Sequence, residues 1–288
     1  MKRHISNYLK MKIPFMGSSD NIEACEKVII GIPMDTTVSF RPGTRLGPFR
    51  VREVSEGIEE YSIYQDKSLE DIDFYDAGDV EIPWGNVVTT LERTEDICNQ
   101  LLEMNKKVFS IGGEHLISLP LIKAYKKKYP DLVVIQIDAH ADLREDYLGE
   151  RLSHATVMRH VVDIVGTKRV YQLGIRSGTK EEMEFARDHT FMYLNKLQSA
   201  VADVIEKVGT AAVYLTLDID VLDPAFAPGT GTPEPGGFTS RELIQVILEL
   251  GELNIVGFDM VEISPPNEKG DLTSILGAKI LREALLMY

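Results

Sequence analysis

The chain has 288 residues, 44% hydrophobic and 26% charged, so it can bury a large core as one α/β domain or as two smaller ones. Its formal net charge of −14 argues against nucleic acid or an anionic membrane as a partner, because both require basic patches. Cys25 and Cys98 are far apart and form no metal-binding or disulfide pattern, which favours a reducing, cytoplasmic location.

Short apolar runs alternate with longer amphipathic segments along the chain. The basic N-terminus lacks the continuous apolar stretch of a signal peptide, and no run approaches the roughly 20 residues of a membrane helix. We predict strands at Lys27–Ile32, Ile72–Asp76, Lys107–Ile111, Leu132–Asp138, Arg169–Gly174, Ala212–Ile219 and Ile255–Val261. We predict helices at Val87–Glu103, Ile117–Tyr129, Asn195–Val208, Ser240–Gly251 and Leu272–Leu286.

The alternation predicts one open, mostly parallel sheet with helices on both faces. Several of the strands are apolar throughout, which is typical of strands that are covered on both sides. Pro48 and Pro120 suit the first turns of helices. In sheets of this kind ligands bind outside the carboxyl ends of the strands, so motifs at those ends are the first candidates for function.

Three of the predicted strands end in ionisable groups. The stretch "VVIQIDAHAD" places acid, imidazole and acid at alternate positions, where side chains share one side of an extended backbone. The stretch "LTLDID" ends in two aspartates, and "SIGGEH" ends in a glutamate and a histidine after paired glycines. The ionisable residues of these motifs are Glu114, His115, Asp138, His140, Asp142, Asp218 and Asp220.

Each motif alone has a structural explanation, because aspartates commonly cap turns and single histidines are commonly hydrogen-bonded. Together, four aspartates at one rim would repel and could not all stay ionised without positive charge nearby. No Lys or Arg lies within the motifs, although Arg144 is close. Two divalent cations would balance the charge. Carboxylates and imidazoles without thiolates favour Mn²⁺, and Zn²⁺ or Co²⁺ could also bind in vitro.

The order and spacing of the motifs resemble the arginase/agmatinase (ureohydrolase) family, and bacterial agmatinases in particular. The resemblance covers nearly the whole chain, through "GIPMDTTVSFRPGTRLGPFRVREVS", "DAGDV", "SIGGEHLISLP", "IDAHADLRED", "LSHAT", "LTLDIDVLDPAFAPGTGTPEPGG" and "FDMVEISPP". It implies a single three-layer α/β/α domain over residues 1–288, with a mostly parallel sheet of about eight strands. Residues 1–25 are then an N-terminal extension that packs at the surface or at an oligomer interface.

The resemblance also implies two Mn²⁺ ions per subunit and six ligands. His115 and Asp142 would bind one ion, His140 and Asp220 the other, and Asp138 and Asp218 both.

Further roles follow from the same resemblance. His154, in "LSHAT", matches the family's proton-shuttling histidine. Glu262 would receive the substrate guanidinium, whose paired N–H groups suit a carboxylate, and Thr232 would be a further contact. Asp142 would accept a proton from the attacking water. Ala141 stands where the family has Thr, and its side chain is expected to point away from the metals.

The implied reaction is hydrolysis of a guanidinium group to urea and an amine, without an organic cofactor. The loop "LREDYLGERLSHAT" carries Glu145, Asp146 and Glu150 against Arg144 and Arg151, a net charge of −1 (−3 + 2), and no Asn. A mildly acidic loop favours the terminal ammonium of agmatine over the carboxylate of arginine, although exposed charges are screened. We therefore expect agmatine to be converted to putrescine and urea, a step in polyamine biosynthesis.

Other functions remain open at this stage. Another ureohydrolase (guanidinobutyrase, guanidinopropionase, arginase or formimidoylglutamase) would share the metal site and differ only at the pocket rim. A deacetylase on the related fold would use one Zn²⁺, and a non-catalytic metal-binding protein would have no need of His154 or Glu262. The resemblance implies a homo-oligomer, a trimer or a hexamer. The loop Ser39–Pro48, "SFRPGTRLGP", lies at the pocket rim or at an oligomer contact.

Overall fold

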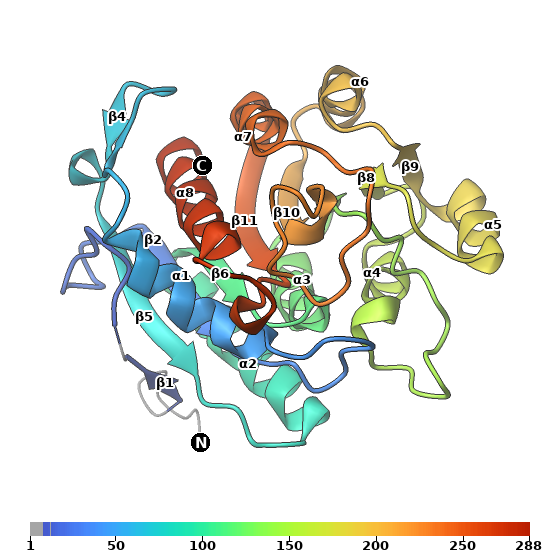
Figure 1. Cartoon of the computed structure of the whole chain (residues 1–288), viewed down its shortest axis with the longest axis horizontal. Helices are drawn as coiled ribbons and strands as arrows, with labels where there is room; N and C mark the ends of the chain where they lie inside the picture. Colours follow the sequence, from blue (N-terminus) through green and yellow to red (C-terminus); the bar gives the residue numbers. More distant parts are fainter. Residues whose placement is uncertain (1–7, 12) are drawn as a thin grey trace.

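The computed structural model describes residues 8–11 and 13–288, and within them the chain forms a nine-stranded central sheet (Figure 1). Its spatial order is β1-β5-β2-β6-β11-β10-β7-β8-β9. Within the described part of this sheet, β1 runs antiparallel to β5 and all other neighbours are parallel. The strands are β1 (Leu9–Lys10), β2 (Lys27–Ile32), β5 (Phe74–Val80), β6 (Lys107–Gly112), β7 (Val133–Ile137), β8 (Val170–Ile175), β9 (Phe191–Leu194), β10 (Ala212–Asp218) and β11 (Asn254–Val261).

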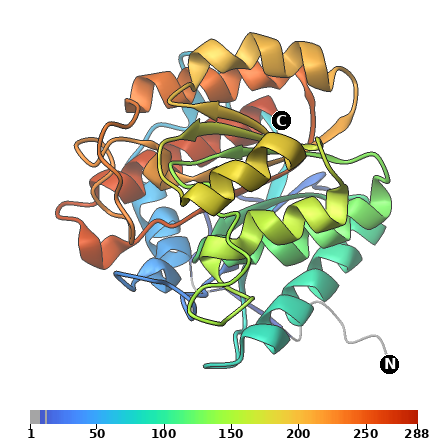
Figure 2. The ribbon, with the colours of Figure 1, turned by 90° about the vertical axis from the view of Figure 1, so that its right-hand side faces the viewer.

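Helices cover both faces of the sheet, which gives the three layers seen edge-on in Figure 2. One apolar core joins the sheet to α1, α6, α7 and α8, and a second joins it to α2, α3 and α4. The helices are α1 (Gly47–Ser55), α2 (Val87–Glu103), α3 (Ser118–Lys128), α4 (Val157–Val165), α5 (Lys180–His189), α6 (Gln198–Val208), α7 (Ser240–Glu249) and α8 (Leu272–Met287). The predicted three-layer, mostly parallel fold is confirmed.

Strand β7 illustrates why the central strands are apolar throughout. Val133 and Ile135 pack in the core beneath α6, α7 and α8, whereas Val134 packs in the core beneath α2, α3 and α4. Successive side chains of a strand point to opposite faces, so a strand covered on both sides needs apolar residues at every position. Gln136 is the polar exception, and its amide donates to Asp138 Oδ2 at 2.6 Å. Gln136, inside β7, therefore helps to orient the carboxylate of Asp138, the first residue after the strand.

Several short elements were not predicted. These are β1, β9, α1, α4, α5 and the small hairpin of β3 (Tyr61–Ser62) and β4 (Lys67–Ser68). Helix α5 is mostly charged, so its hydrophobic periodicity is weak, yet Thr179 and Glu182 form a reciprocal capping box at its start. Pro48, which suggested a helical turn, does lie in the first turn of α1.

Strand β5 runs four residues beyond the predicted end at Asp76. The prediction stopped there because acidic residues are rare inside a sheet. The strand continues because Arg52, on α1, is buried against the Asp76 and Asp79 carboxylates. The helix predicted from Asn195 begins instead at Gln198, since Asn195 itself has a left-handed backbone with φ of 49°.

Part of the N-terminal extension expected over residues 1–25 lies outside the described residues, namely 1–7 and 12. In the described part, β1 adds an edge strand to the sheet, and Phe15 is wholly buried in the core. The backbone N–H of Phe15 donates to Asp76 at 2.8 Å. This part of the segment is therefore integrated into the sheet. Within the described residues, no helix combines the length and apolar character needed to cross a membrane.

The strand order places the candidate site at the centre of the sheet. Strands β10 and β11, late in the sequence, lie between β6 and β7. The carboxyl ends of four adjacent strands, β6, β11, β10 and β7, consequently meet at one rim. Such points, where the order of strands departs from the order of the chain, are where open α/β sheets bind ligands.

Candidate metal centre and active site

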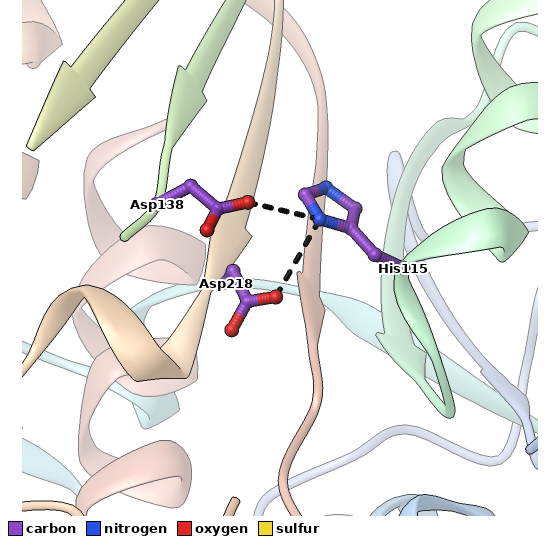
Figure 3. Close-up of side chains that lie close together, drawn as sticks. All are labelled: His115, Asp138 and Asp218. Atoms are coloured by element: carbon purple, nitrogen blue, oxygen red, sulfur yellow. Dashed lines mark ion pairs between the residues drawn. The ribbon is translucent and has the colours of Figure 1, made fainter. Parts of the chain in front are cut away.

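The turns after β6, β7 and β10 bring the six predicted ligand residues together at this rim. His115 is fully buried, and its Nδ1 lies 3.1 Å from Asp138 Oδ2, 3.1 Å from Asp142 Oδ2 and 3.5 Å from Asp218 Oδ2. Figure 3 shows the imidazole of His115 facing the carboxylates of Asp138 and Asp218, which come from neighbouring strands. These three residues form one grouping with metal-ligand spacing.

A second grouping shares Asp138 with the first. His140 Nδ1 lies 2.9 Å from Asp220 Oδ2 and 3.7 Å from Asp138 Oδ1. Asp138 thus turns one oxygen toward each imidazole, which is the arrangement that a bridging carboxylate requires. Of the imidazoles in the described chain, Asp218 lies within ion-pair distance of His115 alone, and its Oδ1 accepts the backbone N–H of Asp220 at 2.9 Å.

The chemistry of the donors suits a divalent cation. His115 Nε2 lies 3.0 Å from the Thr216 hydroxyl, and that hydroxyl donates to Asp259 Oδ1 at 2.6 Å. The hydroxyl hydrogen is thereby used, so Nε2 must carry a proton and donate it. Nδ1 is then a lone pair aimed at carboxylate oxygens, and it has no hydrogen-bond partner among the described residues. Such facing lone pairs repel unless a cation lies between them.

The pKa values of the cluster carboxylates also indicate that a cation belongs among them. Burial raises the pKa of Asp142 to about 6, and the nearby Asp138 adds to the rise. Burial, together with Asp220 and Asp138, also raises the pKa of Asp218. Within the described chain, no Lys or Arg nitrogen lies within 4.0 Å of these carboxylates, and their ion pairs are all with histidines. The cluster therefore lacks a permanent cation of its own.

Two site carboxylates are held on a left-handed backbone. Asp142 has φ of 52° and Glu262 has φ of 65°, a region that non-glycine residues avoid at a cost of roughly 1–3 kcal/mol. The carbonyl of Asp142 accepts the N–H groups of Met158 and Arg159 at the start of α4, and the N–H of Glu262 donates to Gly113. Hydrogen bonds to neighbouring elements thus hold both turns in this conformation.

His154 and Glu262 lie beside the cluster. His154 begins a short 3₁₀ turn (His154–Thr156) before α4, and its Nδ1 is 3.2 Å from Glu262 Oε1. Burial alone would lower the pKa of His154, but the interaction with Glu262 raises it to about 9. Glu262 Oε1 also accepts the His115 N–H at 2.9 Å, whereas Oε2 makes no hydrogen bond to a described residue. Oε2 is therefore the oxygen of Glu262 left to accept a further hydrogen bond, whereas Oε1 is already used by the described residues. Thr232 Oγ1 lies 3.3 Å from Asp220 Oδ2.

A pocket of about 300 Å³ opens above these residues. Its lining includes Thr232, His154 and Ser39, and also residues that the sequence analysis did not single out, namely Tyr147, Ala155, Ser177, Gly178, Thr179 and Glu182. The segment Ser177–Glu182 follows β8, so the strand-end rule that located the aspartates applies to it as well. Ala141 belongs to the apolar core under α2, α3 and α4 and contributes to the pocket wall.

The charges at the pocket mouth differ from those inferred from the loop sequence. Of the charged loop residues, Arg144 lines the pocket, while the three acids do not. Besides Asp142 and Asp218 of the cluster, the acidic residue that lines the pocket is Glu182 of α5, whose Oε2 lies 3.7 Å from Arg144 Nε. Glu182 is buried and accepts the backbone N–H groups of Leu143 and Thr179. Outside the ligand cluster, the described lining therefore carries the Arg144 guanidinium and the Glu182 carboxylate beside each other.

Two features define the class of protein: a central, mostly parallel sheet, and acidic and imidazole side chains at the carboxyl ends of its strands. The chain belongs to the arginase family, whose model matches residues 26–287. It is 48% identical over 275 residues to an agmatinase of Bacillus anthracis, covering 94% of this chain and 95% of that protein. It is 35% identical over 287 residues to a guanidinobutyrase of Pseudomonas aeruginosa, covering 96% and 90% respectively. The crystal structure of the agmatine ureohydrolase of Thermoplasma volcanium superimposes with a TM-score of 0.88 at 30% identity, covering 96% of this chain and 94% of that one. The family resemblance is confirmed.

Proposed function

We propose that this protein is a binuclear manganese amidinohydrolase that converts agmatine to putrescine and urea. One observation carries the proposal: six acidic and imidazole side chains meet at one rim of the sheet, beside Glu262 and His154, and three of the six (His140, Asp142 and Asp218) line the pocket together with His154. The agmatinase similarity supports the choice of reaction.

The six residues fit two hard divalent ions. His115 and Asp142 would hold one, His140 and Asp220 the other, with Asp138 and Asp218 between them. The oxygen-rich donor set favours Mn²⁺. When bound, such ions supply a hydroxide nucleophile at neutral pH.

The remaining chemistry belongs to the chain's own side chains. Hydrolysis forms a C–O bond and breaks a C–N bond at the guanidinium carbon; the attacking water gives up both of its protons, and the departing nitrogen gains two and leaves as an ammonium group. Glu262 orients the guanidinium through Oε2, which no described residue occupies. Asp142 accepts the water's proton. His154, with its proton on Nδ1 beside Glu262, delivers one to the leaving amine.

A second candidate function is hydrolysis of 4-guanidinobutyrate. The observation that favours it is Arg144 at the pocket mouth, because its guanidinium would attract a terminal carboxylate. Glu182 favours the ammonium of agmatine, and the higher identity to an agmatinase than to a guanidinobutyrase supports agmatine as the substrate.

The test is a substrate panel with urea detection. Protein loaded with Mn²⁺ is given agmatine, 4-guanidinobutyrate or arginine at equal concentration, and metal content is measured by elemental analysis. We expect two ions per chain and the fastest urea release from agmatine. Faster release from either other compound would overturn the assignment. Glu262→Gln should keep the ions and lose urea release, whereas Arg144→Ala should lower activity on 4-guanidinobutyrate more than on agmatine.

The wider setting is also proposed from the family resemblance. We infer a cytoplasmic enzyme of polyamine biosynthesis, with one domain over residues 1–288, assembled as a trimer or hexamer. Two free, buried cysteines agree with a reducing compartment. Light scattering on the protein as it leaves a size-exclusion column would measure the number of subunits.

A further inference from the structure

The segment Asp35–Gly43, here called the Ser39 loop, includes the first half of the "SFRPGTRLGP" stretch, for which the sequence suggested no chemical role. The loop follows β2 and closes on itself, because the Gly43 N–H donates to Asp35 Oδ2 at 2.9 Å. Arg45 adds a second bond to Asp35 at 3.1 Å. Gly43 has φ of 136°, and a Cβ at this position would lie 2.5 Å from Ser264 Oγ. The loop is therefore a closed, tightly packed unit.

The Ser39 loop makes three hydrogen bonds to His154. The backbone N–H of Ser39 donates to Nε2 at 3.1 Å, and Ser39 Oγ lies 2.9 Å from the same atom. The backbone N–H of His154 donates to Thr37 Oγ1 at 3.1 Å. His154 is only 7% exposed although it lines the pocket. The loop thus supports both the backbone and the ring of this histidine.

The contact from Ser39 decides which ring nitrogen carries the proton. A backbone N–H can only donate, so Nε2 must accept with its lone pair. Because Glu262 raises the pKa of His154 to about 9, the ring is neutral above that pH, and the single proton of the neutral ring then resides on Nδ1, directed at Glu262 Oε1 at 3.2 Å. This is the tautomer needed for a proton to be held next to the group that orients the substrate.

A buried carboxylate anchors the loop. Glu114 is fully buried; its Oε2 accepts the Thr37 N–H at 2.7 Å, and its Oε1 accepts the Thr37 hydroxyl at 2.5 Å. Because Thr37 uses its hydroxyl hydrogen on Glu114, its oxygen is left to accept from His154. The Glu114 N–H also donates to Met34 O at 2.7 Å, and a Cβ on Gly113 would lie 1.9 Å from that oxygen. The turn that carries His115 therefore also fixes the start of the loop.

We propose that Thr37 and Ser39 are positioning residues that set the orientation and tautomer of His154, with Glu114 as their buried anchor. The catalytic part of this inference rests on the proposed hydrolase function. The contacts themselves do not, so they can be tested separately.

The experiment compares Thr37→Val with Thr37→Ser. Valine keeps the volume and removes the hydroxyl, whereas serine keeps the hydroxyl. Imidazole nitrogen NMR of the Mg²⁺-loaded, ¹⁵N-histidine-labelled protein, followed as the pH is raised past the His154 pKa of about 9, reports the tautomer of the neutral ring, and His154→Ala identifies the signal. We expect the Nδ1–H tautomer in the parent and in Thr37→Ser, and a mixture of tautomers in Thr37→Val. Ser39→Ala, which retains its backbone N–H, should keep the parent tautomer.

Activity supplies the second measurement. Thr37→Val should lower kcat for agmatine at least tenfold while KM changes less than threefold and the metal content stays the same, and Thr37→Ser should recover most of the loss. An unchanged tautomer in Thr37→Val, or a kcat within twofold of the parent, would overturn the proposal. If the parent hydrolyses no guanidinium compound, the proposed function fails, and the NMR result alone still decides whether the loop positions His154.

Discussion

Arg52 provides the sharpest test of how the fold is stabilised beneath the site. Its side chain is 2% exposed, with Nε 2.7 Å from Asp76 Oδ2, Nη2 2.9 Å from Asp76 Oδ1, and Nη1 bonded to Asp79. Burial alone would lower the pKa of Arg52, but the two carboxylates raise it, so the group stays charged. Arg52→Ala would leave two acids, 1% and 7% exposed, without the cation that neutralises them.

Breaking a buried ion pair from one side costs about 3–5 kcal/mol, against about 5–15 kcal/mol for the whole free energy of unfolding. At roughly 2 °C per kcal/mol for a chain of this length, Tm should fall by about 6–10 °C. Urea unfolding and thermal scans at fixed protein and metal concentration would measure the change.

Arg50→Ala is the matched control, because Arg50 lies on the same helix but its side chain is 33% exposed and pairs with Glu53 and Asp271 at the surface. Its loss should cost less than about 1 kcal/mol. Combining Arg52→Met with Asp76→Asn and Asp79→Asn should return much of the stability, since no charge stays buried. Equal destabilisation by Arg52→Ala and Arg50→Ala would refute the reasoning.

Three further predictions concern pH, packing and metal. Burial, with Lys107 nearby, lowers the pKa of Lys27 from 10.5 to about 8, so the folded state is penalised below pH 8 and the penalty disappears as pH rises to 10.5. Lys27→Met should therefore raise Tm at pH 7 but not at pH 10.5, and a gain that grows with pH would contradict this. Gly113→Ala should lower both Tm and urea release, because its Cβ would lie 1.9 Å from Met34 O; calorimetry showing an unchanged Tm would exclude the clash. Removal of metal by a chelator should lower Tm, and Mn²⁺ should restore it. At 100 times Kd, bound Mn²⁺ should add about 2.7 kcal/mol per site to the free energy of unfolding. A Tm that changes with neither treatment would argue against a metal centre.

The sequence was sufficient to predict the groups that meet at the rim. Regular alternation along "IDAHAD" and "LDID" predicted shared faces, and those faces do meet. The same rule applied to the segment after β8 would have located Glu182, and the Thr179–Glu182 capping box would have located α5. These features are local, so a single sequence carries them.

Other features depend on contacts between distant segments and could not be predicted in this way. Nothing near Asp76 indicates that Arg52 will neutralise it, so β5 was ended too early. The left-handed backbone of Glu262 is imposed by its hydrogen bond to Gly113 across the sheet, and a glutamate has no local preference for it. The order of strands is likewise a long-range property.

That strand order constrains how the protein can be made. Strands β6 and β7 leave the ribosome well before β10 and β11, yet both of the later strands come to lie between them. During synthesis His115 and Asp138 therefore follow two strands that each lack a neighbour until β10 and β11 have been made. A metal centre that uses Asp218 and Asp220 cannot be complete before β10 has emerged, so β6 and β7 each keep an unpaired edge, open to association with other chains, until late in synthesis.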